Sequence, residues 1–326
     1  MRHVYYTVWF VIILSLAGFP AAGQQGLSPG SPIRLLVGFT AGSALDLMAR
    51  PLAQKLSERL GQPVVVENRP GANGALATEA AAHAAPDGRT VLMGTSGQTV
   101  ITPLLRSDLS VDPARDLRPV ASIVQPVLTV TVRSDLPVTD FAGLVALARA
   151  QPGRLVMGSA GNGDPSHLAL ELLKREMGLD ILHVPYRGSG PALQDLLGGR
   201  IQLMIAPYIV LKSSVEAGRL RALAVTAASR APSLPALPTV AEAGGPAGFE
   251  VAGIVGLYVA AATQPAAVAR LEATVADALR AGELDRFYTE QGLMPAFRGS
   301  EAFAARLAQE RTKWSRVIRE AGITAD

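Results

Sequence analysis

Four short turns rich in glycine and other small residues have the composition of an anion-binding site. They cover residues 41–46, 95–98, 159–166 and 188–191, and each lies where a predicted strand passes into a predicted helix. The first N–H groups of a helix have no partner within the helix, and the helix dipole favours a negative charge beside them. The turns therefore predict a cleft for a carboxylate. The alternative is that glycine serves only the geometry of α/β turns.

Side chains that could support catalysis or hold a metal are few and poorly spaced. His167 and Glu171 lie four residues apart and would share a helix face, but a zinc site needs a third ligand and the HExxH pattern is absent. No serine lies in GxSxG, since residues 94–97 read GTSG and residues 158–163 read GSAGNG. GSAGNG is also not the GxGxxG of dinucleotide sites. We expect no catalytic residue, no metal and no cofactor, although a Ser/His/acid triad need not be local in sequence.

The first residues, MRHVYYTVWFVIILSLAGFPAAGQQ, have the pattern of a secretory signal peptide. Arg2 and His3 precede an apolar run that ends in small residues near Gly23. The alternative is an uncleaved anchor, but the run is shorter than the roughly 20 residues that span a membrane. We predict a signal peptide over residues 1–23 and a mature protein outside the cytoplasm, without membrane insertion.

Composition narrows the classes of partner. The chain contains no cysteine, so it has no disulfide and no thiolate chemistry. The net charge is +3, aromatic residues make up 5%, and Lys and Arg are scattered, so no nucleic acid partner is expected. About 300 residues follow the signal peptide, which favours two lobes over one core.

The elements that position the turns alternate between strand and helix. Residues 32–39 (PIRLLVGF) form a predicted buried strand, and the strand, turn and helix order then repeats. This order predicts an α/β fold with largely parallel sheets, ending in two helices over residues 265–280 and 301–320. The strand at 127–132 and the proline-rich stretch at 230–248 are candidate crossovers between lobes. They divide the chain into a discontinuous first lobe, residues 32–129 and 251–326, and a second lobe, residues 130–250.

Six segments together resemble the periplasmic solute-binding proteins of tripartite tricarboxylate transporters, the Bug family. They are PIRLLVGFTAGSALDLMARPLAQKLSERLGQPVVVENRPGANG, APDGRTVLMGTSG, GSAGNGDPSHLALELL, HVPYRGSGPALQDLLGGRIQLM, AGRLRALAVTAASRAPSLPALPTVAEAG and GFEVAGIVGLYVA. The resemblance runs from about Pro32 to the C-terminus. It implies a two-lobed periplasmic-binding-protein (Venus flytrap) fold with two interlobe crossovers. It also implies a small, usually carboxylated solute that is handed to a membrane transport complex.

The resemblance also implies which residues bind the ligand. Backbone amides matter more than side chains in this family, so glycines belong to the expected site. The predicted ligand-binding residues are Phe39, Ala41, Gly42, Ser43, Asp46, Thr95, Ser96, Ser159, Ala160, Gly161, Gly163, Asp164, His167, Tyr186 and Ala206. Asp46 in such proteins often holds the ligand through water, whereas its spacing from Ser43 also fits a helix capping box.

Three departures from the family pattern concern the ligand. The first turn usually reads PGGxxD, but here Ala41 and Ser43 replace the proline and the second glycine. Asp164 stands where Ser or Thr is usual, and Ala206 stands where an Asp is often found. Asp164 fits a helix cap before a proline. If its carboxylate instead faces the cleft, it repels a carboxylate and favours an amine or an acid proton. We hypothesise that an acid at 164 in place of one at 206 shifts the ligand chemistry.

These observations predict a periplasmic solute-binding protein, not an enzyme, that captures a small organic acid or amino-acid-like ligand between two lobes. The expected partners are membrane transporter subunits, which bind it transiently, and the protein itself is expected to be a monomer. Two alternatives are a periplasmic sensor that feeds a signalling partner and a hydrolase on the same scaffold. The sequence does not identify the ligand.

Overall fold

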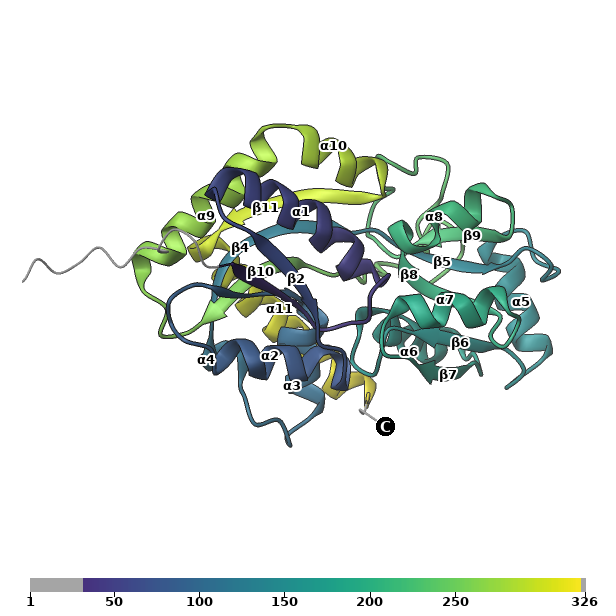
Figure 1. The fold of residues 1–326 in the computed structure, drawn as a ribbon. Coiled ribbons are helices and arrows are strands. Elements are labelled where there is room, and N and C mark those ends of the chain that lie inside the picture. Colours follow the sequence, from purple (N-terminus) through teal and green to yellow (C-terminus); the bar gives the residue numbers. More distant parts are fainter. Residues whose placement is uncertain (1–31, 324–326) are drawn as a thin grey trace, which may run out of the picture.

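The computed structural model describes residues 32–323, which form two lobes that each contain one β-sheet (Figure 1). The predicted signal peptide, residues 1–23, lies outside the described residues. The first lobe begins with β1 (Ile33–Val37), α1 (Ala44–Leu60), β2 (Val64–Asn68), η1 (Ala72–Gly74), α2 (Ala75–Ala82), β3 (Thr90–Thr95), η2 (Gly97–Ile101), α3 (Thr102–Leu105), α4 (Pro113–Asp116) and β4 (Leu117–Pro126).

The second lobe follows, and the chain then returns to the first. The second lobe contains β5 (Leu128–Arg133), α5 (Phe141–Ala150), β6 (Val156–Ser159), α6 (Pro165–Met177), β7 (Leu182–Pro185), α7 (Ser189–Leu197), β8 (Leu203–Pro207), α8 (Tyr208–Glu216) and β9 (Leu220–Val225). The returning part contains β10 (Val255–Ala260), α9 (Pro265–Arg280), α10 (Glu283–Glu290), β11 (Leu293–Gly299) and α11 (Ser300–Ala321).

Both sheets are mixed, so the expectation of largely parallel sheets is wrong. The first sheet has the order β11-β4-β10-β3-β1-β2 and the second β7-β6-β8-β5-β9. Strands β1, β2 and β3 are parallel, as are β6, β7 and β8. The strand that follows each crossover runs the other way, since β10 is antiparallel to β3 and β4, and β5 is antiparallel to β8 and β9. An apolar run shows that a strand is buried but not its direction.

The chain crosses between the lobes twice, first through a short segment and then through a long one. Only Val127 separates β4 of the first sheet from β5 of the second. The boundary predicted at 129/130 therefore lies inside β5, whose residues Leu128 and Thr129 already pair with β8. The return passes through residues 226–254, where the Val251 N–H donates to the Thr226 carbonyl at 2.9 Å, and it enters the first sheet at Val255.

The C-terminal region differs from the two helices expected there. Helix α10 and strand β11 lie between α9 and α11, and β11 pairs with β4 at the edge of the first sheet. Pro295 lies in β11, which is an edge strand and therefore tolerates proline. Because β4 also contains prolines, Pro119 and Pro126, neither strand is easily recognised from the sequence pattern. The end of α11 reaches the second lobe, where buried Trp314 belongs to the same hydrophobic cluster as Leu168 and Phe249. The last helix thus adds a connection between the lobes.

Candidate functional site

Helix starts from both lobes face one another across the cleft. The Ala44 N–H at the start of α1 donates to the Ser189 hydroxyl at the start of α7, at 3.1 Å. Nearby, the Thr40 N–H donates to the Arg187 carbonyl at 3.4 Å. A Cβ at Gly97 would lie 2.7 Å from Pro165 Cδ in the opposite lobe. The turns predicted from glycine content therefore meet in space, and the two lobes are in contact.

A small cavity of about 50 Å³ lies among these helix starts. Its lining residues come from both lobes and are Phe39, Ser43, Ala44, Leu45, Met48, Thr95, Pro126, Ala160, Asp164, Ser166, Ser189, Ile205, Ala206, Pro207 and Val255. Four of them carry hydroxyl groups and one carries a carboxyl group, whereas none of these described residues is Lys, Arg or His. An anion in this cavity would have to be bound by hydroxyl and backbone N–H groups.

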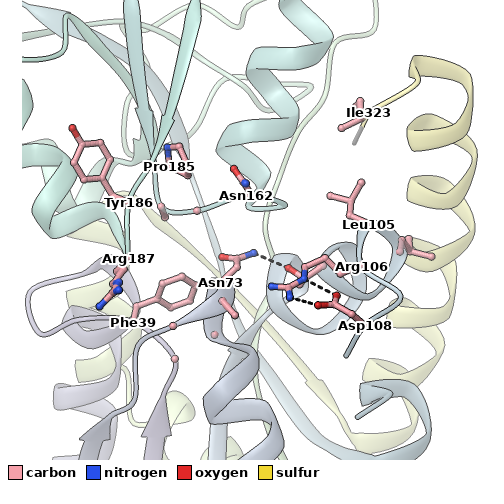
Figure 2. A pocket seen from close by; sticks show the side chains of 18 of the residues that line it. Phe39, Asn73, Leu105, Arg106, Asp108, Asn162, Pro185, Tyr186, Arg187 and Ile323 are labelled. Carbon is pink, nitrogen blue, oxygen red and sulfur yellow. Dashed lines mark hydrogen bonds and ion pairs between the residues drawn. The ribbon is translucent and has the colours of Figure 1, made fainter. Parts of the chain in front are cut away.

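A larger cavity of about 840 Å³ adjoins the small one (Figure 2). Phe39 and Ala160 line both cavities. The other residues that line it are Gly38, Gly71, Ala72, Asn73, Gly74, Thr102, Leu104, Leu105, Arg106, Ser107, Asp108, Gly161, Asn162, Pro185, Tyr186, Arg187 and Ile323. Arg106 pairs with Asp108 at 2.6 Å, so part of its positive charge is already neutralised. The larger cavity has room for a ligand body, and the small one for a head group.

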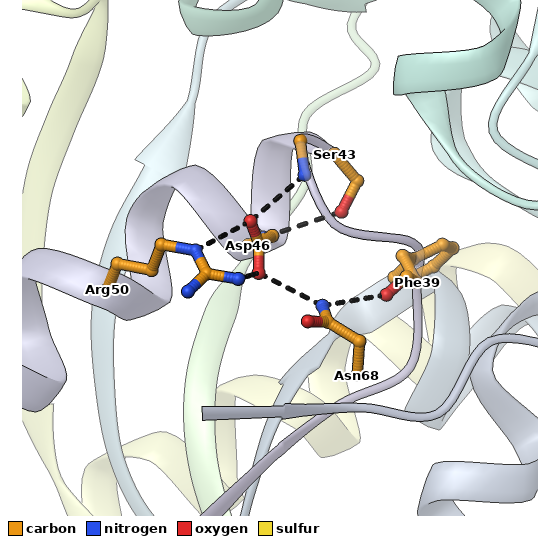
Figure 3. A network of polar contacts seen from close by, with 6 residues as sticks. Phe39, Ser43, Asp46, Arg50 and Asn68 are labelled. Carbon is orange, nitrogen blue, oxygen red and sulfur yellow. Dashed lines mark hydrogen bonds and ion pairs between the residues drawn. The ribbon is translucent and has the colours of Figure 1, made fainter. Parts of the chain in front are cut away.

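Asp46 is buried in a network that holds the first turn together (Figure 3). Its carboxylate accepts from Arg50 Nε at 2.9 Å and Arg50 Nη2 at 2.8 Å, from Asn68 Nδ2 at 3.0 Å and from the Gly42 N–H at 2.9 Å. Burial opposes ionisation, but these donors outweigh it, so the pKa of Asp46 lies below its ordinary value.

A capping box consists of two reciprocal hydrogen bonds, and only one of them forms at the start of α1. Ser43 is the N-cap and accepts from the Asp46 N–H at 3.4 Å. The reciprocal carboxylate bond goes to Gly42, whose φ of +76° suits glycine, and not to Ser43. Asp46 is absent from the described linings of both cavities and lies behind the turn, and its contact with a ligand through water stays a prediction.

Asp164 caps α6 and also lines the small cavity, so the two roles considered for it coexist. Its Oδ1 accepts from the Ser166 N–H at 2.9 Å and from the Ser166 hydroxyl at 2.5 Å. Removal from water raises the pKa of the Asp164 carboxyl, although both Ser166 bonds favour the charged form. Within residues 32–323, no cationic side chain forms an ion pair with it.

His167 and Ser159 belong to a buried cluster that sequence reasoning did not foresee. The rings of His167 and His183 stack with centroids 4.2 Å apart, and His183 Nε2 lies 2.6 Å from the Ser159 hydroxyl. Burial lowers the pKa of His167, and burial with the charges of His167 and Lys174 lowers the pKa of His183 to about 3. The lowered pKa values favour the neutral form of both rings, and His167 Nδ1 accepts from the Gly163 N–H at 3.2 Å.

This cluster has the composition of neither a metal site nor a complete catalytic triad. Glu171 pairs with Lys174 at 2.9 Å and not with His167. No carboxylate hydrogen-bonds to either histidine ring in the described part of the chain. Across the same residues, no group of three His, Asp or Glu side chains is placed to hold a metal ion.

The predicted site residues separate into three groups in the structure. Those that line the small cavity are Phe39, Ser43, Thr95, Ala160, Asp164 and Ala206. Gly161 and Tyr186 line the larger cavity. Ala41, Gly42, Asp46, Ser96, Ser159, Gly163 and His167 lie around the turns outside both described linings.

Two of these residues serve the turns in ways that the sequence does not show. Ser96 connects the turn at residues 95–98 to the segment that returns from the second lobe, since its hydroxyl accepts from the Ile254 N–H at 3.1 Å. The Tyr186 ring points away from the larger cavity (Figure 2). Its hydroxyl donates to Asp195 at 2.8 Å. Burial and the Asp195 charge raise the pKa of Tyr186 to about 12. Tyr186 therefore contributes mainly backbone to the cavity wall.

Sequence reasoning missed two hydroxyl residues in the small cavity, Ser166 and Ser189. Both lie in the first turn of a helix that begins after a strand end, α6 and α7. A serine at such a position in two of the four predicted turns was the available signal.

The family follows from comparison with known proteins. A model described as the tripartite tricarboxylate transporter family receptor matches residues 48–323. The chain belongs to this family. BugT of Bordetella pertussis is 33% identical over 312 residues, which cover 95% of each chain. The resemblance to the Bug family is thereby confirmed.

Two solved structures of similar proteins were determined with bound ligands. Rpa4515 of R. palustris with adipate has a TM-score of 0.88 and 37% identity, covering 91% of this chain and 99% of that one. MatC of Rhodopseudomonas palustris with bound malate has a TM-score of 0.84 and 31% identity, and the match covers 89% of this chain and 100% of that one. The predicted two-lobed α/β fold of periplasmic binding proteins is confirmed, and family and fold are those of solute-binding proteins. In residues 32–323, no helix is both long and apolar enough to cross a membrane.

Proposed function

We propose that this protein captures a small carboxylate-bearing metabolite between its two lobes in the periplasm and delivers it to a tripartite tricarboxylate-type membrane transporter. The observation that carries the proposal is the cavity pair between helix starts of opposite lobes. Rpa4515 with adipate and MatC with malate, which share the fold at 37% and 31% identity, support a carboxylic acid as the ligand.

Binding is proposed to occur by closure of the lobes on the ligand. The ligand carboxylate accepts from hydroxyl groups such as Ser43 and Ser189 and from backbone N–H groups at the helix starts, where the dipole favours negative charge. Val127 and the residues just before Val255 are the only chain connections between the sheets in the described residues, so they are the proposed hinge. No covalent step is involved. A micromolar Kd corresponds to about −8 kcal/mol, which a few charge-assisted hydrogen bonds and exclusion of water can supply.

The hydrolase alternative has less support than binding. Its best candidate pair is Ser159 with His183, 2.6 Å apart, but Ser159 is fully buried. A triad also needs an acid to orient the histidine, and among residues 32–323 none bonds to His183. Family and fold are those of solute-binding proteins, so the prediction that the chain is not an enzyme stands as part of this proposal.

The ligand would be identified by mass spectrometry of small molecules that co-purify with the mature protein. A thermal-shift screen of mono- and dicarboxylates would follow, because a ligand that binds the folded state raises the Tm by mass action. We expect one or more carboxylic acids in both experiments. A protein that carries none and is stabilised by none would refute carboxylate capture.

Delivery would be tested by uptake of the identified ligand into cells that lack this gene. Loss of uptake, restored by the parent gene, is the expected result. Normal uptake with an altered transcriptional response to the ligand would instead indicate the sensor alternative.

A further inference from the structure

The small cavity contains one ionisable side chain among its described lining residues, and that side chain is acidic. Asp164 faces a set of hydroxyl and apolar groups that includes Ser43, Thr95 and Ala206. A dicarboxylate whose head enters this cavity meets no cationic side chain in its wall. It does meet a carboxyl group, which repels it when ionised.

The contacts of Asp164 leave its charge without a positive partner. Both hydrogen bonds to it come from Ser166 and reach the same oxygen, Oδ1. No Lys, Arg or His in the described chain forms an ion pair with it, whereas Asp46 at the start of α1 has Arg50 at 2.8 Å. Burial raises the pKa of Asp164, which means that removal from water disfavours its ionised form. A cation beside the carboxyl group would offset that cost, and no described side chain supplies one.

The remaining polar groups suit a carboxylate. Ser43 and Ser189 lie at the starts of α1 and α7, where hydroxyl and backbone donors gather. The cavity thus combines anion-binding helix starts with one acidic side chain. A ligand that satisfies both carries a negative group and a hydrogen-bond donor for Asp164, and an ammonium donor also compensates the charge of the carboxylate.

We infer that Asp164 selects ligands that present an ammonium group, so that the solute class of this protein is small amino acids and not unsubstituted dicarboxylates. This inference rests on the proposed function, because it names the class of ligand that the same cleft captures. Asp164 accepts a hydrogen bond from the ammonium group, while hydroxyl and backbone donors bind the carboxylate.

Matched pairs of ligands that differ only in the amino group test this directly. The probes are L-aspartate against succinate and L-glutamate against glutarate, titrated by calorimetry into the purified mature protein. The parent protein is expected to bind at least one amino acid about tenfold or more tightly than its partner acid. Asp164→Asn and Asp164→Ser are expected to weaken amino acid binding by about 10- to 100-fold, the range for a lost hydrogen bond to a charged group. Neither variant should weaken binding of the partner acid.

Both substitutions keep a residue that caps helices well, so loss of folding does not account for the result. Asp140→Asn is the matched control, because Asp140 caps α5 by accepting from the Gly143 N–H at 2.7 Å and is exposed to solvent. It is expected to bind all four probes as the parent does.

The outcomes separate this inference from the proposed function. If succinate or glutarate binds the parent more tightly than its amino acid, or if the Asp164 variants keep the parental preference, the inference is wrong and carboxylate capture stands. If no amino acid binds but other carboxylic acids do, the same conclusion holds. If no carboxylic acid of either kind binds, both proposals fail.

Discussion

The starts of α1 and α6 carry an aspartate at nearly the same place, yet the two carboxyl groups lie in opposite environments. Asp46 receives four hydrogen bonds, two of them from Arg50, and lies behind its turn. Among the described residues, the Asp164 carboxyl accepts hydrogen bonds from Ser166 only, and Asp164 lines the cavity between the lobes. The pKa of Asp46 is lowered, whereas burial raises the pKa of Asp164.

The difference shows that an acid at a helix start has no fixed role. The Asp164 carboxyl accepts from a backbone N–H of its own helix, as the sequence spacing predicts, whereas the Asp46 carboxylate accepts from the Gly42 N–H ahead of α1 and the Asp46 N–H donates to Ser43. What separates them is the further set of partners, which for Asp46 includes Arg50 on the same helix and Asn68 from a distant strand. Asn68 reaches Asp46 from β2, whereas the surroundings of Asp164 include Ala206 at the end of β8. One carboxylate stabilises a turn and the other remains available to a ligand.

The largest effect is expected from Asp46→Asn. An amide cannot keep the two bonds from Arg50 together with those from Asn68 and Gly42, so we expect the free energy of unfolding to fall by about 2–3 kcal/mol. Urea unfolding at pH 7 measures this. The control is Asp277→Asn, which removes a pair with Arg280 that lies on the surface. Surface changes of this kind stay within about 0.5 kcal/mol. Equal losses in the two variants would contradict the structural role of Asp46.

Gly97→Ala is expected to weaken ligand binding by about tenfold, or about 1.4 kcal/mol, without a comparable loss of stability. The new methyl group would lie 2.7 Å from Pro165 at the start of α6, so the lobes would have to separate. Calorimetry with the identified ligand tests the affinity, and small-angle scattering of the saturated protein tests the separation. Gly253→Ala is the control, because its Cβ would lie 3.9 Å from the same proline. A Gly97→Ala protein with parental affinity would show that the contact is not needed for closure.

Asp164→Asn is expected to stabilise the ligand-free protein at pH 7 by about 1 kcal/mol, the scale of one buried polar contact. The raised pKa means that folding disfavours the ionised form, so the cost is present above the folded pKa and absent below the unfolded value of about 3.9. Unfolding at pH 7 and at pH 4 should therefore show a difference that shrinks as the pH falls. For Asp46 the sign is opposite, since its stabilisation is lost as the pH falls through its lowered pKa. An Asp164→Asn protein less stable than the parent at pH 7 would contradict the comparison.

The smallest effect is expected from Tyr186→Phe. Its hydroxyl bonds to Asp195 and not into the cavity, so ligand affinity should stay within about twofold of the parent. Calorimetry under the same conditions decides this. A tenfold loss would mean that the tyrosine hydroxyl contacts the ligand.

Much of the fold was predictable because local rules are strong in this chain. Apolar runs such as residues 32–39 formed the expected strands, and caps such as Ser43 and Asp164 began the expected helices. The turns expected to meet in the cleft do so, although the ligand contacts of the predicted residues stay predictions. Strand β11, with Pro295 inside it, and the direction of β10 were not foreseen, because edge strands and pairing direction depend on neighbours distant in sequence.

The sequence by itself determined that four helix starts offer N–H groups, that Asp46 and Asp164 lie in first turns or caps, and that no motif for metal or nucleotide binding is present. These properties depend on residues within a few positions of one another. The spacing of Asp46 and Arg50, one helical turn apart, also belongs to the local sequence. Only the tertiary structure decided that Asn68 reaches Asp46 from β2, that Asp164 lines the cavity, and that no cationic side chain in the described chain pairs with Asp164. Burial and the contacts between distant segments are set by packing, and together with the local partners they set the chemistry of each carboxyl group.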